Sequence, residues 1–241
     1  RGARAEVRGA INAPVEVDGG PNLVDSTAFV LGPLGRLNGD VTLRRDAQFR
    51  LVDSRITGNV RLIGRTLFEG YGTIRGDLLG SRVGVDLSPT IVVGESPNSS
   101  GGRPDATLRI NGDFRQVGAL SLSFSGRRPG ISHDFIEVGG TTLLSGLLDL
   151  NFDRALGLVV TDRFDILSSV GTIEGSFDAI SSVGVPVGLI ALTQITPNGV
   201  AVIFAAAPPP VPEPGSVFLL LAGMSGLVLR VRALRRNSAS L

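Results

Sequence analysis

A short glycine-centred motif recurs along the first half of the chain at nearly constant spacing. The sequence 38–41, Asn-Gly-Asp-Val, returns in related form at 57–60, 75–78 and 111–114. The steps between its glycines, from Gly39 to Gly58, Gly76 and Gly112, are 19, 18 and 36 residues, and we interpret the last as two periods. So short a period is typical of a solenoid, in which each coil buries its apolar side against the next. We expect each glycine to occupy a corner where the backbone turns left-handed.

Between these motifs the chain shows short runs in which apolar and polar residues alternate, with no helical periodicity before residue 216. Such alternation predicts β-strands with one buried face, and the Gly, Asn and Asp residues between the runs are typical of turns. The runs include 41–43, 60–63, 83–87, 120–124, 148–152 and 200–204. We therefore expect an all-β body over 1–204, folded as a right-handed parallel β-helix. A β-sandwich is the alternative, because it has the same alternation and turns.

The last part of the chain carries three consecutive signals. A proline-rich segment over 205–211 predicts an extended linker between domains. The motif Pro212-Glu213-Pro214 follows, then an uncharged apolar run over 217–229. A basic cluster closes the chain, formed by Arg230, Arg232, Arg235 and Arg236.

The apolar run has 13 residues. As a helix it would measure about 20 Å, which is shorter than the roughly 30 Å of a bilayer core. Its position before an arginine cluster nevertheless favours a single transmembrane helix over 217–229, since flanking arginines extend to the interface. All 22 acidic residues precede Pro214, together with 19 of the 23 arginines, so the body carries about −3 and the tail +4. A basic tail is typical of the cytoplasmic side of a membrane, and the acidic body gives no reason to expect nucleic acid.

This C-terminal arrangement resembles the PEP-CTERM sorting signal of Gram-negative envelope proteins. The resemblance covers 212–241 and implies that Pro212, Glu213 and Pro214 are recognised by exosortase, a transient partner. It also implies an inner-membrane stage, with the chain held by its C-terminal helix, followed by processing and delivery to the cell surface or the extracellular matrix of a biofilm. Such an exported protein needs a signal peptide, which the opening Arg1-Gly2-Ala3-Arg4 does not provide. We expect that the leader has been trimmed or that the sequence is a fragment.

A second resemblance lies in the body, over about 105–180. Its order of segments is similar to the closing part of autotransporter-passenger-like β-helices. His133 stands where that pattern has an aromatic residue before Asp134. The segments that carry the similarity are 108–116, 129–138, 147–150, 162–167 and 175–177. We use it as support for the fold alone.

Residues suited to chemistry are scarce. The chain has no cysteine and a single histidine, so thiolate sites are absent and the commonest general base is nearly so. We interpret His133 and Asp134 as structural, because no serine motif accompanies them. The alternating Asp149, Asn151 and Asp153 fail the spacing of a calcium loop and predict a solvated strand face. The tripeptide 75–77, Arg-Gly-Asp, coincides with a repeat turn, so we assign it to the turn. We predict no catalytic residue, no metal site and no cofactor.

Two functions remain open. The first is a non-enzymatic surface or extracellular-matrix protein, structural or adhesive, whose partners include extracellular polysaccharide. The second is a β-helical polysaccharide lyase or hydrolase with the same sorting tail. A groove lined by at least three converging carboxylates with an adjacent arginine would favour the enzyme.

Overall fold

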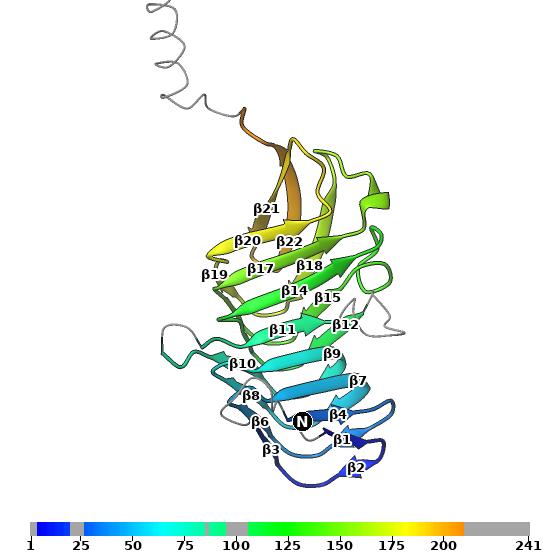
Figure 1. Ribbon diagram of the computed structural model, residues 1–241, viewed down its shortest axis with the longest axis vertical. Coiled ribbons are helices and arrows are strands. Elements are labelled where there is room, and N and C mark those ends of the chain that lie inside the picture. Colours follow the sequence, from blue (N-terminus) through cyan, green and yellow to red (C-terminus); the bar gives the residue numbers. More distant parts are fainter. Residues whose placement is uncertain (1–3, 20–26, 85–86, 95–105, 210–241) are drawn as a thin grey trace, which may run out of the picture. The chain divides into compact units, whose positions relative to one another are not determined.

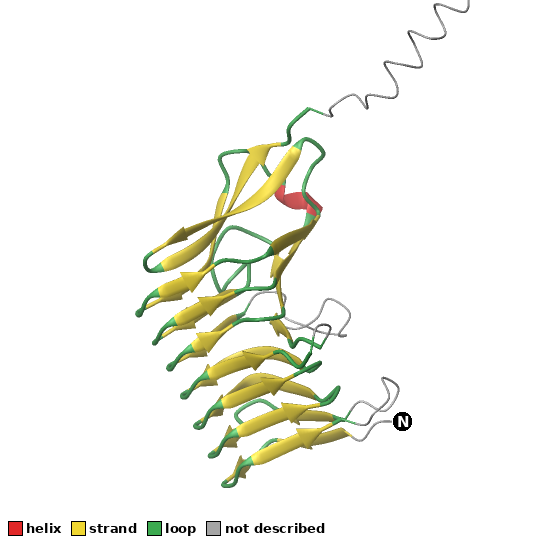
Figure 2. Cartoon of the chain, turned by 90° about the vertical axis from the view of Figure 1, so that its left-hand side faces the viewer, coloured by secondary structure: helices red, strands yellow, loops and turns green. Residues whose placement is uncertain are grey.

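The computed structural model describes residues 4–19, 27–84, 87–94 and 106–209, and within them the chain winds as a stack of coils (Figure 1). Each coil adds one strand to a minor sheet and one or two strands to a major sheet. The strands of successive coils lie one above another (Figure 2), and the coils follow one another in sequence order (Figure 1). A coil cannot bury its apolar residues alone, so the stack shares one core.

The minor sheet has seven strands, and all of its neighbours pair in parallel. Its strands are β3 (Val15–Asp18), β6 (Val41–Arg44), β8 (Val60–Ile63), β10 (Leu78–Ser81), β13 (Phe114–Arg115), β16 (Thr142–Leu144) and β19 (Ile173–Gly175). The first residues of successive strands are paired with one another, so the register repeats from coil to coil. This register places apolar residues of neighbouring coils on the same inner column.

The major sheet has fifteen strands. They are β1 (Arg4–Val7), β2 (Ala10–Ile11), β4 (Ala28–Leu31), β5 (Arg36–Leu37), β7 (Gln48–Ile56), β9 (Leu67–Ile74), β11 (Thr90–Val93), β12 (Thr107–Ile110), β14 (Ala119–Phe124), β15 (Phe135–Val138), β17 (Leu147–Phe152), β18 (Arg163–Ser169), β20 (Ala179–Val183), β21 (Leu189–Thr196) and β22 (Gly199–Ala206). In β7 and β9 one long strand spans the width of the coil. Later coils divide this strand in two, and loops such as 125–134 and 153–162 enter between the halves.

The core lies between the two sheets and consists of inward-facing side chains stacked coil upon coil. Phe29, Phe49 and Phe68 occupy one register column, with ring centroids 5.3 and 5.9 Å apart. The alternation predicted from the sequence is visible in β14, where Leu120, Leu122 and Phe124 are buried and the residues between them are half-buried. Full burial of each such side chain contributes about 1.5–3 kcal/mol.

The last strands change direction. β22 runs antiparallel to β18, and β21 runs antiparallel to β22. This hairpin brings Phe204 against Phe152 and Phe164, with ring centroids 5.4 and 6.1 Å apart. The antiparallel pair covers core residues that the parallel coils leave at this end, and it makes the major sheet mixed. β22 continues to Ala206, two residues into the predicted linker 205–211.

The repeated glycines lie directly on one another in consecutive coils. A Cβ atom on Gly58 would stand 2.4 Å from the Gly39 carbonyl oxygen, and one on Gly76 would stand 2.7 Å from that of Gly58. None of the four motif glycines has a positive φ, so the expectation of left-handed corners is wrong. Glycine is required because the coils approach too closely for any side chain. The 36-residue step is also not two coils, because the N–H of Gly112 donates directly to Gly76 O at 3.1 Å.

The residue after each of these glycines connects one coil to the next. Oδ1 of Asp40 accepts a hydrogen bond from the Asn59 N–H at 2.8 Å, and Asn59 Oδ1 accepts from the Asp77 N–H at 2.9 Å. Asp77 Oδ1 accepts from the Asp113 N–H at 2.9 Å, and Asp113 Oδ1 from the Thr141 N–H at 2.8 Å. We call this column the Asx ladder. Asp77, the aspartate of the Arg-Gly-Asp tripeptide, is a member of this ladder, so its hydrogen bonds are made within the fold.

The predicted fold class needs correction. A parallel β-helix followed by a transmembrane helix does not describe this chain, because the major sheet is mixed and the described residues contain no α-helix. Among those residues, no helix has the length and apolarity needed to cross a bilayer. The predicted span 217–229 lies outside them. The β-sandwich alternative also fails, because the strands pair in parallel from β5 to β13.

Candidate functional site

A hollow of about 480 Å³ lies where the chain leaves the first strands of the minor sheet. It is lined by Glu16, Asp18, Arg44, Arg45, Asp46, Ile63, Gly64, Arg65, Val83 and Leu87. We call it the ion-pair groove. Its residues come from the ends of β3, β6 and β8, from the turns that follow them, and from Val83 and Leu87 after β10, so four successive coils build it.

The turn after β6 has an uncommon backbone that positions the charged side chains. Arg45 and Asp46 are consecutive non-glycine residues with φ of 45° and 60°. This left-handed geometry costs energy for such residues, so the surroundings must hold it. The Asp46 N–H donates to Arg65 O at 2.7 Å, and the next turn places Gly64 at a φ of 71°. The two turns therefore stack and project their side chains to the same side.

Each carboxylate of the groove forms an ion pair with an arginine of the following coil. Arg44 Nε lies 3.0 Å from Glu16 Oε1, and Arg45 Nε lies 2.7 Å from Asp18 Oδ1. Arg65 Nη2 lies 2.8 Å from Asp46 Oδ2, and a second contact between Arg65 and Asp46 makes the pair bidentate. Bidentate arginine–carboxylate pairs have the strongest geometry among such contacts.

Two of these pairs lower the pKa of their carboxyl group. The hydrogen bond from Arg45 holds the pKa of Asp18 below its ordinary range, with partial burial opposing the shift. The hydrogen bond from Arg65 likewise lowers the pKa of Asp46, whose side chain is only 10% exposed. A general acid in a glycosidase needs the opposite shift, toward a raised pKa. The groove thus gathers three carboxylates beside arginines, yet Asp18 and Asp46 are held as anions.

The remaining wall of the groove is apolar. Val83 and Leu87 are 47% and 39% exposed, and the Val83 N–H donates to Leu87 O at 2.9 Å. Within the described ranges, no group of three or more His, Cys, Asp or Glu side chains could hold a metal ion. The groove therefore offers a ligand hydrogen-bond donors, hydrogen-bond acceptors and a small apolar surface.

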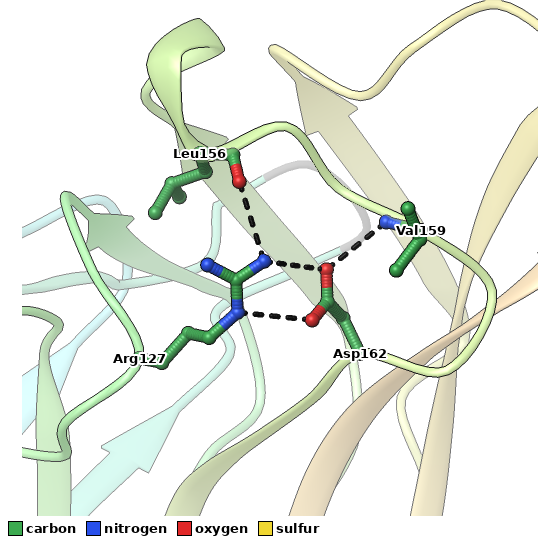
Figure 3. A network of polar contacts seen from close by, with 4 residues as sticks. All are labelled: Arg127, Leu156, Val159 and Asp162. Atoms are coloured by element: carbon green, nitrogen blue, oxygen red, sulfur yellow. Dashed lines mark hydrogen bonds and ion pairs between the residues drawn. The ribbon is translucent and has the colours of Figure 1, made fainter.

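A second polar network joins the two loops inserted into the later coils (Figure 3). Arg127 lies in the loop 125–134, and Asp162 lies at the end of the loop 153–162. Arg127 Nε and Nη2 each lie 2.9 Å from an oxygen of Asp162, and Nη2 also donates to Leu156 O at 3.3 Å. Asp162 accepts a further hydrogen bond from the Val159 N–H at 3.0 Å. The network holds the loops together and lowers the pKa of Asp162, chiefly through Arg127.

His133 and Asp134 are both fully buried, away from any external substrate. The His133 ring lies against Phe124 and Phe164, with centroids 5.2 and 5.6 Å apart. Its Nε2 is 2.8 Å from the carbonyl oxygen of Asp165. Asp134 accepts hydrogen bonds from the Ser123 N–H at 2.7 Å and the Ala106 N–H at 3.2 Å. These contacts join strands, as a structural role requires.

The alternating polar residues 149, 151 and 153 do not act as a unit. Asp149 and Asn151 are half-buried on the outer face of β17. Asp153 instead caps the short 3-10 turn η2 (Arg154–Leu156), where its Oδ1 accepts from the Ala155 N–H at 2.9 Å.

The residues that the sequence assigned to sorting lie outside the described residues. They are Pro212, Glu213, Pro214, Arg230, Arg232, Arg235 and Arg236. Sequence reasoning missed the ion-pair groove. The available signal was an acid followed one coil later by an arginine, as in Asp46 and Arg65, which are 19 residues apart.

Comparison with known proteins gives little further guidance. No family model matches the chain, and no solved structure matches it. It is similar to the AP-1 complex subunit beta-1 of Homo sapiens, with 30% identity over 115 residues. That match covers 46% of this chain and 11% of the relative's length, so it shows no family.

Proposed function

We propose that this chain is an exported structural or adhesive protein of the Gram-negative cell surface or extracellular matrix. Exosortase is its transient partner and reads Pro212, Glu213 and Pro214. The protein works as a stacked scaffold and carries out no reaction. Its lasting partner is extracellular polysaccharide.

The observation that supports the scaffold role is that the charged side chains of the ion-pair groove are paired with one another. Each of its carboxylates is joined to an arginine of the next coil, so the charges connect coils. The Asx ladder and the stacked phenylalanines connect the same coils inside. A solenoid of this kind presents long polar faces, which suit many weak contacts to a repetitive polymer.

The address rests on the sequence pattern of the tail, and cell fractionation tests it. The full chain, joined to a signal peptide and bearing an epitope at the fully exposed Val187 turn, is expressed in matched strains with and without exosortase. We expect a shortened species at the surface or in the matrix only where exosortase is present. A Pro212→Ala, Glu213→Gln, Pro214→Ala variant should be retained in cells, whereas a Pro208→Ala, Pro209→Ala variant should be processed normally. Release of one identical species by both strains would refute the sorting proposal.

A polysaccharide lyase or hydrolase is the second candidate, because Glu16, Asp18 and Asp46 do line one groove. The lowered pKa values of Asp18 and Asp46 count against it. A viscosity assay on acidic and neutral polysaccharides decides between the two. We expect no depolymerisation by the full chain. Depolymerisation that disappears in Asp46→Asn, but persists in Asp149→Asn, would establish the enzyme instead.

A further inference from the structure

Two arginines that do not line the ion-pair groove occupy opposite positions on adjacent coils. Arg36 in β5 and Arg55 in β7 are direct partners across parallel strands. Both side chains are exposed, and the following residues Leu37 and Ile56 are fully buried. Because side chains alternate along a strand, both guanidinium groups project outward on the same face.

Within the described ranges, neither arginine of this pair forms an ion pair, although Asp53 lines a hollow with them. The column of the pair continues to Ala10 on one side and Thr73 on the other, and neither carries charge. Neither arginine takes part in a side-chain hydrogen bond between described residues. Like charges directly opposite each other destabilise a sheet, so the chain by itself gains nothing from the pair.

Another arginine in the same column does have an ion-pair partner. One strand beyond Thr73 lies Arg109, whose Nε is 2.7 Å from Glu137 Oε2 on the next strand. The positions paired with Arg36 and Arg55 on the outer strands are Ala10 and Thr73, so neither arginine has a carboxylate directly opposite it. Their two positive charges are therefore left for an external anion.

The two arginines also line a hollow of about 250 Å³. Its other residues are Leu34, Gly35, Asp53, Ser54, Gly72 and Thr73. Two arginines and one aspartate leave it with a net positive charge, and the Thr73 hydroxyl and Asp53 carboxylate can bond hydroxyl groups. Leu34 is 82% exposed and offers an apolar surface at the rim. Anionic groups, hydroxyls and a C–H face occur together in an acidic sugar.

We propose that the hollow between Arg36 and Arg55 binds the acidic sugar units of an extracellular polysaccharide. This inference rests on the proposed matrix function and names the chemical class of its ligand. An acidic polymer lying along the column meets Arg36 and Arg55 about 4.8 Å apart, one per strand. A single-stranded nucleic acid fits poorly, because the described residues that line the hollow include no aromatic side chain on which a base could stack.

Binding to polygalacturonate, with dextran as the neutral comparison, tests the proposal. The purified full chain is titrated with each polymer at about 0.05 and about 0.5 M NaCl. We expect binding to polygalacturonate that weakens with salt and little binding to dextran. The Arg36→Gln, Arg55→Gln variant should bind about tenfold to a hundredfold more weakly, because each charge-assisted contact is lost.

A control variant distinguishes binding at this site from a general effect of the protein's positive charge. Arg61 and Arg115 are exposed on the outer face of the minor sheet, and Leu79 separates them in the register. Arg61→Gln, Arg115→Gln removes the same charge and should leave binding unchanged. Equal loss in the two double variants, or equally tight binding of single-stranded DNA, would overturn the proposal.

The urea midpoint of unfolding provides an independent measurement. It distinguishes a pair of arginines kept for ligand binding from a pair that stabilises the fold. If the arginines repel each other, Arg55→Gln should raise the urea midpoint slightly at low salt while it weakens binding. A lowered midpoint would show that the pair stabilises the fold and would count against the proposal. If the chain does not bind polygalacturonate, the expected result of the cell fractionation is unchanged. This proposal and the sorting proposal can therefore fail separately.

Discussion

The side-chain oxygen of Asn59 accepts a hydrogen bond from the backbone N–H of Asp77, 2.9 Å away and one coil further along. Asn59 is the one amide in the Asx ladder between carboxylates, with Asp40 before it and Asp77 after it. A neutral acceptor at this point joins two coils and keeps Asp40, Asn59, Asp77 and Asp113 from forming a row of four consecutive negative charges.

Replacement of Asn59 by alanine should lower the free energy of unfolding by about 1–3 kcal/mol, because the Asp77 N–H loses its partner. Urea denaturation followed by circular dichroism measures the loss. Asp149→Ala is the control, since the Asp149 side chain makes no hydrogen bond or ion pair between described residues, and its effect should lie within about 0.5 kcal/mol. Equal losses in the two variants would contradict the role of the ladder.

The glycine stack predicts a sharp difference between two Gly→Ala substitutions. Gly58→Ala places a Cβ atom 2.4 Å from Gly39 O, so the coils must separate, at a cost of about 1–3 kcal/mol. Gly9→Ala meets nothing within 4 Å and should be tolerated. The measurement is the urea midpoint of each variant. A Gly58→Ala protein as stable as Gly9→Ala would show that the coils do not stack as described.

The Arg127–Asp162 pair should make stability depend on pH. Arg127 lowers the pKa of Asp162 in the folded protein, whereas the unfolded value is about 3.9. The stabilisation is therefore fully present above that value and is lost as the pH falls through the lower folded pKa.

Arg127→Gln removes this contribution, so wild type and variant should differ more in urea midpoint at about pH 6 than at about pH 2.5. Arg128→Gln, at the neighbouring exposed position, has no described ion pair to lose and should follow the wild type at both values. A difference that stays constant with pH would mean that Arg127 acts through packing alone.

The buried histidine should matter for stability. His133→Phe keeps an aromatic ring beside Phe124 and Phe164 but removes the contact between Nε2 and Asp165 O. We expect a loss of about 1–3 kcal/mol in the free energy of unfolding, because the ring nitrogen and the carbonyl oxygen are partners in the interior. Ile131→Ala, at a side chain 69% exposed, should change stability little. An unchanged free energy of unfolding in His133→Phe would contradict a structural role for His133.

The sequence by itself determined the local structure of the body. Alternation predicted the strands later seen as β14, β17 and β22, and the glycine motif marked successive coils from Gly39 onward. The run 83–87 was wrongly predicted to be a strand, since Val83 and Leu87 pair with each other as an antiparallel bridge. Alternation depends on neighbours within a few residues, so a short sequence segment reports it well, but a turn with the same pattern is indistinguishable.

Only the tertiary structure decided which distant residues meet. Arg45 pairs with Asp18 across 27 positions and Arg65 with Asp46 across 19, so no constant spacing announces the ion-pair groove. The antiparallel pairing of β22 with β18 and the register that places Arg36 opposite Arg55 likewise depend on how distant strands meet. The physical reason is that a strand's residues fix which side chains face outward, while the loops between strands fix which outward side chains become neighbours.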